Sequence, residues 1–491
     1  MNGGLLYLGW SLPALVVFGA IATGRVGILT ASLMGLFTAL VSAIASAPKE
    51  FSIDDAGIAL MRGAWIGWIV VPYILGGLLF WRMAIRPGTA EMPIETHLDD
   101  ARTRRRFLFA ACYLIGPFAE SATGFGVGII GTMVLVRRLN FKPIELLTFS
   151  LLSQTMIVWG AMGSGAIVSA AYARIDPSNL AVHSGLVFLL FNVLWLPIYW
   201  RMADRAGVQV GWTERLSELA WLVICLGLTI LATTLLGPES AMLSVFGPAI
   251  VLRYLIDERP TRAELAVAAQ RMLPFTLLIG WLALTRLVPS LNQVLQTEFR
   301  INPFAGTPAW SPLFHAGTWL IVAAILVGVL RGQRQEFSRE VSASWKTGRL
   351  AVLTIIVFSM MAEVLSRSGI ADGLARGIFS SMGVWSIIVT PIISAVFGAL
   401  ANSGNAANGL FMASQQSLAA EAGLNVAAVV ALQHASALSL NMVSPVRMSI
   451  VCNLAGTPDH ERSAYRAMMP FVAVIALVVM TFSVLIAVRL I

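Results

Sequence analysis

The feature that most constrains this chain is the recurrence of apolar stretches of about twenty residues along nearly its whole length. Of its 491 residues, 57% are hydrophobic and 12% are charged, and the mean hydropathy is +0.80. Soluble domains carry about 25% charged residues, so this composition leaves no room for a sizeable water-exposed domain. A membrane core about 30 Å thick needs about 20 apolar residues per helix. We therefore predict an all-α integral membrane protein without a soluble domain.

Twelve stretches have the length and apolar content of a membrane-spanning helix. They lie at residues 5–22, 27–47, 64–82, 144–171, 185–200, 217–236, 240–256, 272–289, 315–331, 350–366, 424–451 and 468–489. Two further segments, 107–136 and 384–420, are long but are broken by a polar, glycine-rich centre. Non-helical backbone is tolerated at membrane depth only where it is buried in protein or lines a cavity. We interpret both segments as re-entrant hairpins of two half-helices.

Clusters of Lys and Arg orient the chain, because positive residues mark the cytoplasmic side. The densest clusters are Arg82–Arg106, Arg201–Arg215, Arg253–Arg271 and Arg331–Arg349. All four share one side only if segment 107–136 enters and leaves by the same face, since Arg137, Arg138 and Lys142 follow it closely. One long tilted span, with an arginine pair outside, is the alternative.

A weak internal repeat relates the two interrupted segments. Gly116-Pro-Phe-Ala-Glu-Ser-Ala-Thr-Gly-Phe-Gly126 matches Gly398-Ala-Leu-Ala-Asn-Ser-Gly-Asn-Ala-Ala-Asn408. At nearly the same offset, Ala161-Met-Gly-Ser-Gly165 matches Asn441-Met-Val-Ser-Pro445. Two matches in register favour duplication over the alternative of ordinary small-residue packing faces.

The two copies prefer opposite sides of the membrane. Between its motifs the first copy carries Arg137, Arg138 and Lys142, whereas the second carries only Glu421. We therefore predict an inverted-topology repeat, with one half at residues 1–256 and the other at 257–491. That arrangement is typical of secondary transporters, whose substrate lies near the midplane between broken helices.

Each repeat offers a hairpin tip followed by a span that is interrupted, at Gly160–Gly165 or at Met442–Pro445. We expect these four breaks to meet in one anion site, because half-helix ends there present unpaired backbone dipoles. The predicted substrate-binding residues at the breaks are Ser121, Thr123, Gly124, Asn402, Ser403, Asn405 and Ser444. Arg447 joins them if its guanidinium holds a carboxylate; the alternative is that it extends to the cytoplasmic face.

Glu120 lies in the middle of the first hairpin, where burying a charge costs about 2.5–3.5 kcal/mol. We predict that it couples transport to a proton, and the alternative is that it caps the second half-helix. Further polar or small residues beside the breaks are predicted to line the cavity: Ser153, Gln154, Gly163, Ser164, Gln433, His434 and Asn441. A hydrogen-bonded packing role is the alternative for His434.

Several of these motifs resemble those of the lactate permease family. They are Phe118-Ala-Glu-Ser-Ala-Thr-Gly-Phe-Gly126, Phe141-Lys-Pro143, Gly160-Ala-Met-Gly163, Asn408-Gly-Leu-Phe411 and Asn441-Met-Val-Ser-Pro445. The resemblance covers roughly residues 115–175 and 395–475. It implies a proton symporter of lactate, glycolate or a related 2-hydroxy monocarboxylate in a bacterial plasma membrane, multi-pass, built on inverted repeats.

The chain departs from the family pattern at the last motif, which usually reads Lys-Met-Ile-Ser-Pro-Gln. Asn441 replaces the family lysine, Val446 fills the glutamine position, and Arg447 follows directly. The Asn-Thr that usually precedes Gly-Ala-Met-Gly is Ser153-Gln154 here. These departures concern the substrate more than the fold.

Other classes of protein fit the sequence less well. The phosphate-binding loop of an ATP-driven pump and the His-Glu-X-X-His of a metalloprotease are absent, and Cys112, Cys225 and Cys452 are too scattered for a disulfide framework. We predict no enzyme, no cofactor and no metal site, with H+ as the coupling ion. Open alternatives are Na+ coupling with another organic acid, a channel, and an intramembrane hydrolase using Ser164 and His434. The predicted partners are a small organic anion and the lipid bilayer, without nucleic acid; a homodimer is compatible with the sequence.

Overall fold

The computed structural model describes residues 3–85, 98–124 and 126–491, and within them every regular element is helical. An isolated β-bridge joins Ile301 and Trp310. Arg86 of the first basic cluster and Phe125 of the first motif lie outside the described residues. The predicted all-α class is therefore confirmed for the described chain.

The α-helices follow one another along the whole chain. They are α1 (Gly3–Ala22), α2 (Ile28–Ser46), α3 (Ile53–Ile69), α4 (Val71–Ile85), α5 (Ala101–Ala110), α6 (Gly116–Thr123), α7 (Val127–Arg137), α8 (Pro143–Leu152), α9 (Ser164–Ala173), α10 (Pro177–Arg205), α11 (Trp212–Leu236), α12 (Pro238–Glu258), α13 (Arg262–Leu287), α14 (Pro289–Thr297), α15 (Ala316–Leu330), α16 (Arg334–Arg367), α17 (Ile370–Met382), α18 (Ser386–Ala401), α19 (Gly404–Glu421), α20 (Val426–Ser439), α21 (Pro445–Ala455) and α22 (Glu461–Ala487).

Eleven helical stretches of the described chain are long and apolar enough to cross a membrane. Ten of them overlap predicted spans. The predicted spans 144–171 and 315–331 appear instead as helices of fewer than eighteen residues, and the eleventh stretch is Ile370–Ala401. The chain is thus a multi-pass membrane protein, whereas the count of twelve spans stays a prediction.

Helix α17 and the early start of α3 were not expected from hydropathy. Helix α3 begins at Ile53, eleven residues before the predicted span at 64, because Ser52 and Asp55 form a reciprocal capping box. Charged residues in the first turn, Asp54 and Asp55, lower the apolar content that marks a span. Local capping chemistry, rather than hydrophobicity, decides where this helix begins.

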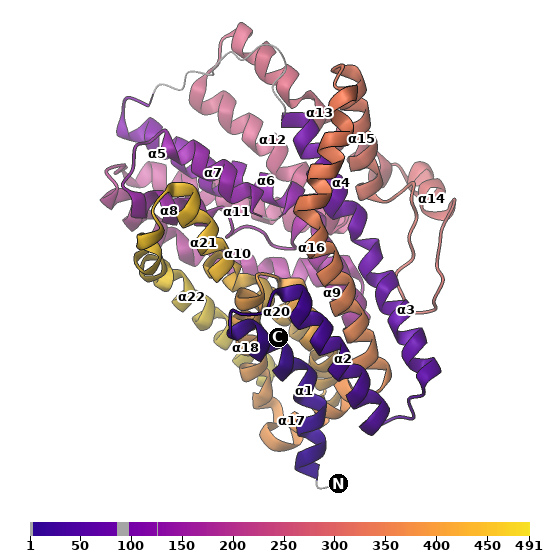
Figure 1. Ribbon diagram of the computed structural model, residues 1–491. Coiled ribbons are helices and arrows are strands. Elements are labelled where there is room, and N and C mark those ends of the chain that lie inside the picture. Colours follow the sequence, from indigo (N-terminus) through magenta and orange to yellow (C-terminus); the bar gives the residue numbers. More distant parts are fainter. Residues whose placement is uncertain (1–2, 86–97, 125) are drawn as a thin grey trace.

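Helix α16 runs through the length of the molecule and organises the helices around it (Figure 1). It packs against α2, α3, α4 and α19, while α15 packs against α4. These contacts join the first 85 residues to the second half of the chain. The two predicted halves are therefore interlocked, and the boundary at 256 stays a prediction.

Both interrupted segments form helical hairpins. In the first, Thr132 Oγ1 donates to the Ala111 carbonyl at 3.2 Å, and Gly128 N lies 2.8 Å from the Glu120 carboxylate, so the arms run antiparallel on either side of residues 124–126. In the second, α18 and α19 pack together across the turn at Asn402 and Ser403. Re-entry through a single membrane face stays a prediction.

The two broken spans follow their hairpins in the predicted places. Between α8 and α9 the chain leaves the helical path, and Met162 adopts φ 47° and ψ 39° within a 3₁₀ turn. Between α20 and α21 a 3₁₀ turn at Leu440–Val443 ends at Ser444, and Pro445 starts the next helix. The predicted breaks at Gly160–Gly165 and Met442–Pro445 are confirmed.

The packing between the repeats is reciprocal. Helix α9 packs against α19, and its counterpart α21 packs against α7; likewise α10 packs against α20, and its counterpart α22 packs against α8. If a two-fold axis relates the repeats, each contact of a helix from one repeat must have a counterpart made by the equivalent helix of the other, as these pairs do.

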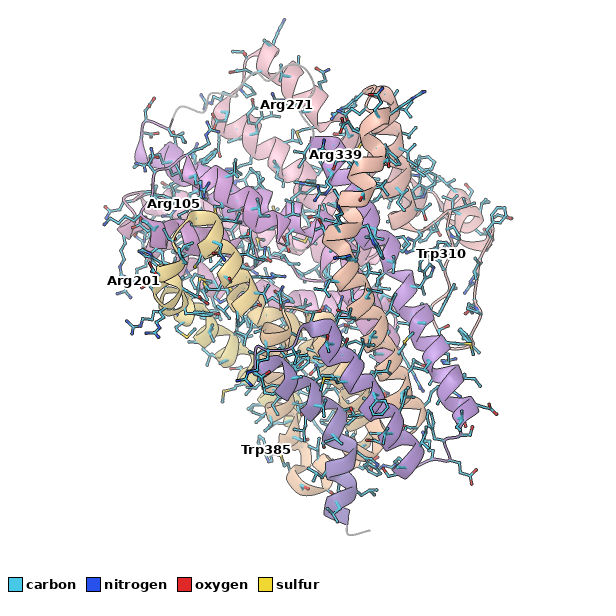
Figure 2. All side chains as sticks on the ribbon, viewed as in Figure 1. Arg105, Arg201, Arg271, Trp310, Arg339 and Trp385 are labelled. Carbon is cyan, nitrogen blue, oxygen red and sulfur yellow. The ribbon has the colours of Figure 1, made fainter. Side chains whose placement is uncertain are left out.

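The four basic clusters lie toward one end of the molecule. Figure 2 shows Arg105, Arg201, Arg271 and Arg339, one from each cluster, in its upper and left part, whereas Trp310 and Trp385 lie at the right and at the bottom. This distribution agrees with the cytoplasmic side assigned from the positive residues.

We predict that Arg138 and Glu421 face opposite sides of the membrane. Both residues are exposed at the ends of the second hairpin arms, and the three native cysteines are buried. Cysteines introduced at the two positions should therefore react with an impermeant maleimide from opposite sides of sealed vesicles. Labelling of both positions from the same side would contradict the inverted repeat.

Candidate functional site

Arg447 is the point at which the four broken segments meet. It lies on α21, two residues after the break at Pro445. Its Nε donates to Asn402 Oδ1 at the second hairpin tip at 3.0 Å, and its Nη1 donates to Gln154 Oε1 in the first broken span. Its Nη2 lies 3.9 Å from Glu120 Oε1 in the first hairpin. The side chain is 12% exposed, so it turns into the protein rather than toward the cytoplasmic face.

Glu120 closes the tip of the first hairpin. Its carboxylate accepts hydrogen bonds from Gly126 N at 2.9 Å and Gly128 N at 2.8 Å. The two arms approach closely at Gly128, where a Cβ would lie 2.4 Å from the Gly116 carbonyl oxygen, so this position requires glycine. Backbone N–H groups at the start of α7 are thus satisfied by a carboxylate. Glu120 therefore caps the second half-helix, which was the alternative to proton coupling. Proton coupling by Glu120 stays a prediction.

The second hairpin tip is held by its own backbone and by the first repeat. Asn402 adopts a left-handed conformation with φ 51°, which lets its amide oxygen face Arg447. Ser403 caps α19 by accepting from Ala406 N at 3.3 Å. Asn405 Oδ1 lies 3.2 Å from the position that a Cβ on Gly165 would occupy. The tip of the second repeat therefore lies against the break of the first.

Gly163 makes the first break possible. It has φ +64°, a left-handed conformation that favours glycine, and a Cβ on it would lie 2.6 Å from the backbone of Pro238. Ser164, next to it, is buried at the start of α9. The backbone at this break is paired internally, since Gly165 N donates to the Trp159 carbonyl at 2.9 Å.

A buried polar cluster lies beside this site and joins both repeats. Asn408 Nδ2 on α19 donates to Ser169 Oγ on α9 at 2.8 Å and lies 3.1 Å from His434 Nδ1 on α20. Gln433 Nε2 donates to Ser394 Oγ on α18 at 2.6 Å. His434 and Gln433 sit inside helix α20, whereas Ser153 and Gln154 lie past the end of α8. These two pairs, both predicted to line the cavity, therefore differ in local structure.

The remaining predicted residues divide by whether they have partners. Thr123 and Ser153 are buried and bonded to nearby carbonyls, at Ala119 and Ser150. Ser121 is bonded to the Phe118 carbonyl at 2.9 Å and lines a cavity of about 10 Å³ with Gly163 and Glu239. In contrast, Ser444 Oγ and Asn441 Oδ1 are buried without a hydrogen-bond partner in the described chain. Gly124, at the end of α6 with φ +73°, lies against Ala161.

Sequence reasoning missed three features of the structure. Asn408 and Ser169 hold His434, although Asn408 was recognised only as part of a motif. Arg286 and Glu363 are buried and form ion pairs, Arg286 with Glu239 at 3.0 Å and Glu363 with Arg62 at 2.8 Å. No sequence signal marked these two ion pairs, because the partners in each pair are far apart in the chain.

The basic cluster before the first hairpin, which was used above only to orient the chain, also forms ion pairs inside the protein. Arg105 is 0% exposed and makes two bonds to the Glu218 carboxylate, at 2.7 Å and 3.1 Å. Arg106 makes two bonds to Glu214, both at 2.9 Å. Glu214 and Glu218 are one turn apart and therefore lie on the same face of α11. Their spacing was the sequence signal that this face could pair with neighbouring arginines.

The arrangement can hold a small anion. Arg447 offers a guanidinium fork, which matches a carboxylate, among amide and hydroxyl groups at four helix ends. Within the described residues, no group of three or more His, Cys, Asp and Glu side chains is placed to hold a metal ion.

Comparison with known proteins gives matches over nearly the whole chain. The family model described as L-lactate permease matches residues 8–491. The glycolate permease GlcA of Escherichia coli is 22% identical, and the L-lactate permeases of Bacillus subtilis and Escherichia coli are 20% and 21% identical; each alignment covers 93% of this chain and 91% of the relative.

Two solved transporter structures are also similar. The YdaH transporter of Alcanivorax borkumensis is 14% identical with a TM-score of 0.43, covering 100% of this chain and 98% of that chain. MtrF of Neisseria gonorrhoeae, described as an antimetabolite efflux pump, is 12% identical with a TM-score of 0.45, covering 94% and 95%.

We predict that Gly163→Ala destabilises the protein by about 2–5 kcal/mol. A left-handed conformation costs a non-glycine residue about 1–2 kcal/mol, and forcing a methyl against the Pro238 backbone adds about 1–3 kcal/mol. The measurement is thermal unfolding in detergent. Gly131→Ala, on α7 where a Cβ meets nothing within 4 Å, is the matched control and should leave stability unchanged or higher. Equal melting temperatures for the two variants would refute the strain at Gly163.

Proposed function

Because the chain belongs to the L-lactate permease family, we propose that it is a secondary active transporter that carries a small 2-hydroxy monocarboxylate, such as lactate or glycolate, together with a proton. The names of the glycolate and L-lactate permeases among its relatives support the substrate class. The observation that carries the proposal is the position of Arg447, buried where both hairpin tips and both broken spans meet.

Arg447 is proposed to bind the substrate carboxylate. Its present partners besides Glu120 are the neutral amides of Asn402 and Gln154, which a charged carboxylate replaces with a stronger, bidentate bond. Ser403, Asn405 and the unpartnered Ser444 hydroxyl lie on the same broken segments and supply hydrogen bonds. Ser121, Thr123 and Gly124 contribute the backbone of the first tip, since their side chains are bonded locally or absent.

Charge balance is the argument for a proton as the coupled ion. In the structure the positive Arg447 and the carboxylate of Glu120 lie 3.9 Å apart. A monocarboxylate entering alone leaves two negative groups beside one arginine, and an uncompensated charge at membrane depth is costly. A proton on Glu120 restores neutrality. One anion and one proton thus move together, and a Na+ ion in place of the proton is the alternative.

The two repeats provide the moving parts. Hairpin tips and broken spans from both halves form one site, and the reciprocal packing of α9 on α19 and α21 on α7 lets each half rearrange against the other. The cluster of Ser169, Asn408 and His434 crosses the same boundary and is proposed to line the cavity. Gln433, Asn441, Ser164 and Gly163 complete that lining.

The relatives named above are bacterial proteins, and the helical content makes this chain a multi-pass membrane protein. We place it in the bacterial plasma membrane. The proposed partners are the organic anion and the surrounding lipid, and the proposed mechanism uses no cofactor and no metal.

We predict that Glu120→Gln abolishes accumulation of lactate or glycolate driven by a pH gradient, while exchange of substrate for substrate persists. The amide resembles the protonated carboxyl, so the site stays neutral with the anion bound but releases no proton. Reconstituted vesicles with an imposed pH gradient provide the measurement. Full accumulation by the variant would remove Glu120 from coupling, and accumulation driven by a Na+ gradient alone would establish the alternative ion.

We predict that Arg447→Lys weakens the apparent affinity for lactate or glycolate by roughly tenfold to a hundredfold. Lysine keeps the charge but lacks the planar fork, and a bond to a charged group contributes about 1.5–3 kcal/mol. Counterflow in vesicles measures this affinity. Arg334→Lys, at an exposed position on α16, is the control and should leave it unchanged. An unaltered affinity in Arg447→Lys would exclude the proposed contact.

A further inference from the structure

A cavity lies apart from the transport site, at the predicted cytoplasmic ends of α10 and α11. Its volume is about 550 Å³. It is lined by Pro197, Trp200, Arg201, Asp204, Arg205, Gln209, Trp212 and Arg215. Nothing in the proposed transport mechanism uses these residues.

The cavity carries an excess of positive charge. Its single carboxylate, Asp204, is already paired, with Arg215 at 2.6 Å and with Arg105 at 3.6 Å. The exposed side chains of Arg201 and Arg205 form no ion pair or hydrogen bond with other described residues, and the buried Nε of Arg215 has no hydrogen-bond partner among them. The cavity is therefore lined by three guanidinium groups and by one carboxylate that is already paired. Guanidinium groups are suitable hydrogen-bond donors for an anion with several oxygens.

Two tryptophans form the apolar part of the cavity wall. The rings of Trp200 and Trp212 meet edge to face with centroids 6.2 Å apart, and the Arg215 guanidinium lies 5.2 Å from the Trp212 ring. Such contacts hold the cation over an aromatic face. Tryptophan is enriched at the level of lipid headgroups, so the cavity combines headgroup depth with a positive charge.

An apolar surface leads away from the cavity toward the membrane core. Trp212 is 68% exposed, and Leu216, one turn later on the same face of α11, is 58% exposed. On α10, Leu194 is 38% exposed, one turn before Pro197. A soluble anion would leave this surface uncovered, whereas the acyl chains of a lipid with its phosphate in the cavity would cover it.

We propose that this cavity binds the headgroup phosphate of an anionic phospholipid of the cytoplasmic leaflet. Arg201, Arg205 and Arg215 hold the phosphate, and the acyl chains lie along the exposed apolar face of α10 and α11. Basic pockets between membrane helices on the cytoplasmic side are suited to such headgroups.

The same site is linked to the first hairpin. Asp204 contacts both Arg215 in the cavity and Arg105 on α5, the helix that leads into that hairpin. A phosphate that takes over Arg215 leaves Asp204 to Arg105 and strengthens the attachment of α5. Lipid binding at this cavity therefore stabilises the folded protein.

The test uses the full chain purified in a neutral detergent and titrated separately with phosphatidylglycerol, phosphatidylcholine and inorganic phosphate. Bound lipid is counted by native mass spectrometry, and the melting temperature is followed in parallel. We expect phosphatidylglycerol to bind and to raise the melting temperature, and the other two to do neither. The same titration is repeated with Arg201→Gln/Arg205→Gln, in which affinity should fall roughly thirtyfold, because each arginine contributes about 1 kcal/mol, or about fivefold.

The matched control is Arg334→Gln/Arg349→Gln, which removes the same charge from exposed positions on α16 and should bind as the unaltered protein does. Equal loss in both double variants would show a general charge effect and overturn the site. Binding of inorganic phosphate with the same melting shift would make it a soluble-anion site, and equal binding of phosphatidylcholine would make it unspecific; either result overturns the proposal. Because both readouts are independent of transport, they do not depend on the proposed function.

Discussion

The need to pair every backbone polar group in an apolar medium is the constraint on which this structure depends. Each helix break exposes N–H and C=O groups, and in the two hairpins a side chain accepts hydrogen bonds from such N–H groups. Glu120 accepts from Gly126 and Gly128 in the first hairpin, and the Ser403 hydroxyl caps α19 in the second. Because the breaks are closed from within, the chain can keep four irregular segments together inside a helical protein, and polar side chains at these segments become free for a ligand.

Arg447 adds a positive charge to this framework and connects segments that are far apart in sequence. Its partners Gln154 and Glu120 come from the first repeat and Asn402 from the second. Relative to the family pattern, the positive side chain has moved from the position of Asn441 to that of Arg447, while Asn441 stays buried with an unpartnered amide oxygen. One cation therefore lies beside the second break.

The two hairpins are anchored by different interactions. The arm that leads into the first hairpin is fixed by ion pairs of Arg105 and Arg106 with Glu218 and Glu214, all of them deeply or partly buried. The second is held by side-chain hydrogen bonds such as Asn408 to Ser169 and by the packing of α18 and α19 on α20. Removing one member of a buried ion pair leaves the other charge buried without a partner, so the first arm is the more sensitive of the two to a single substitution.

The sequence by itself determined the membrane-embedded helical class, the places where helices break and the family, because apolar length, glycine, proline and short motifs act locally along the chain. It also marked Glu120 and Arg447 as charges that need an explanation. Which side chains pair with which was decided by tertiary structure: nothing in the chain order joins Arg447 to Gln154 or Glu363 to Arg62. Repeats copy local pattern, but side-chain partners depend on which helices the fold brings together.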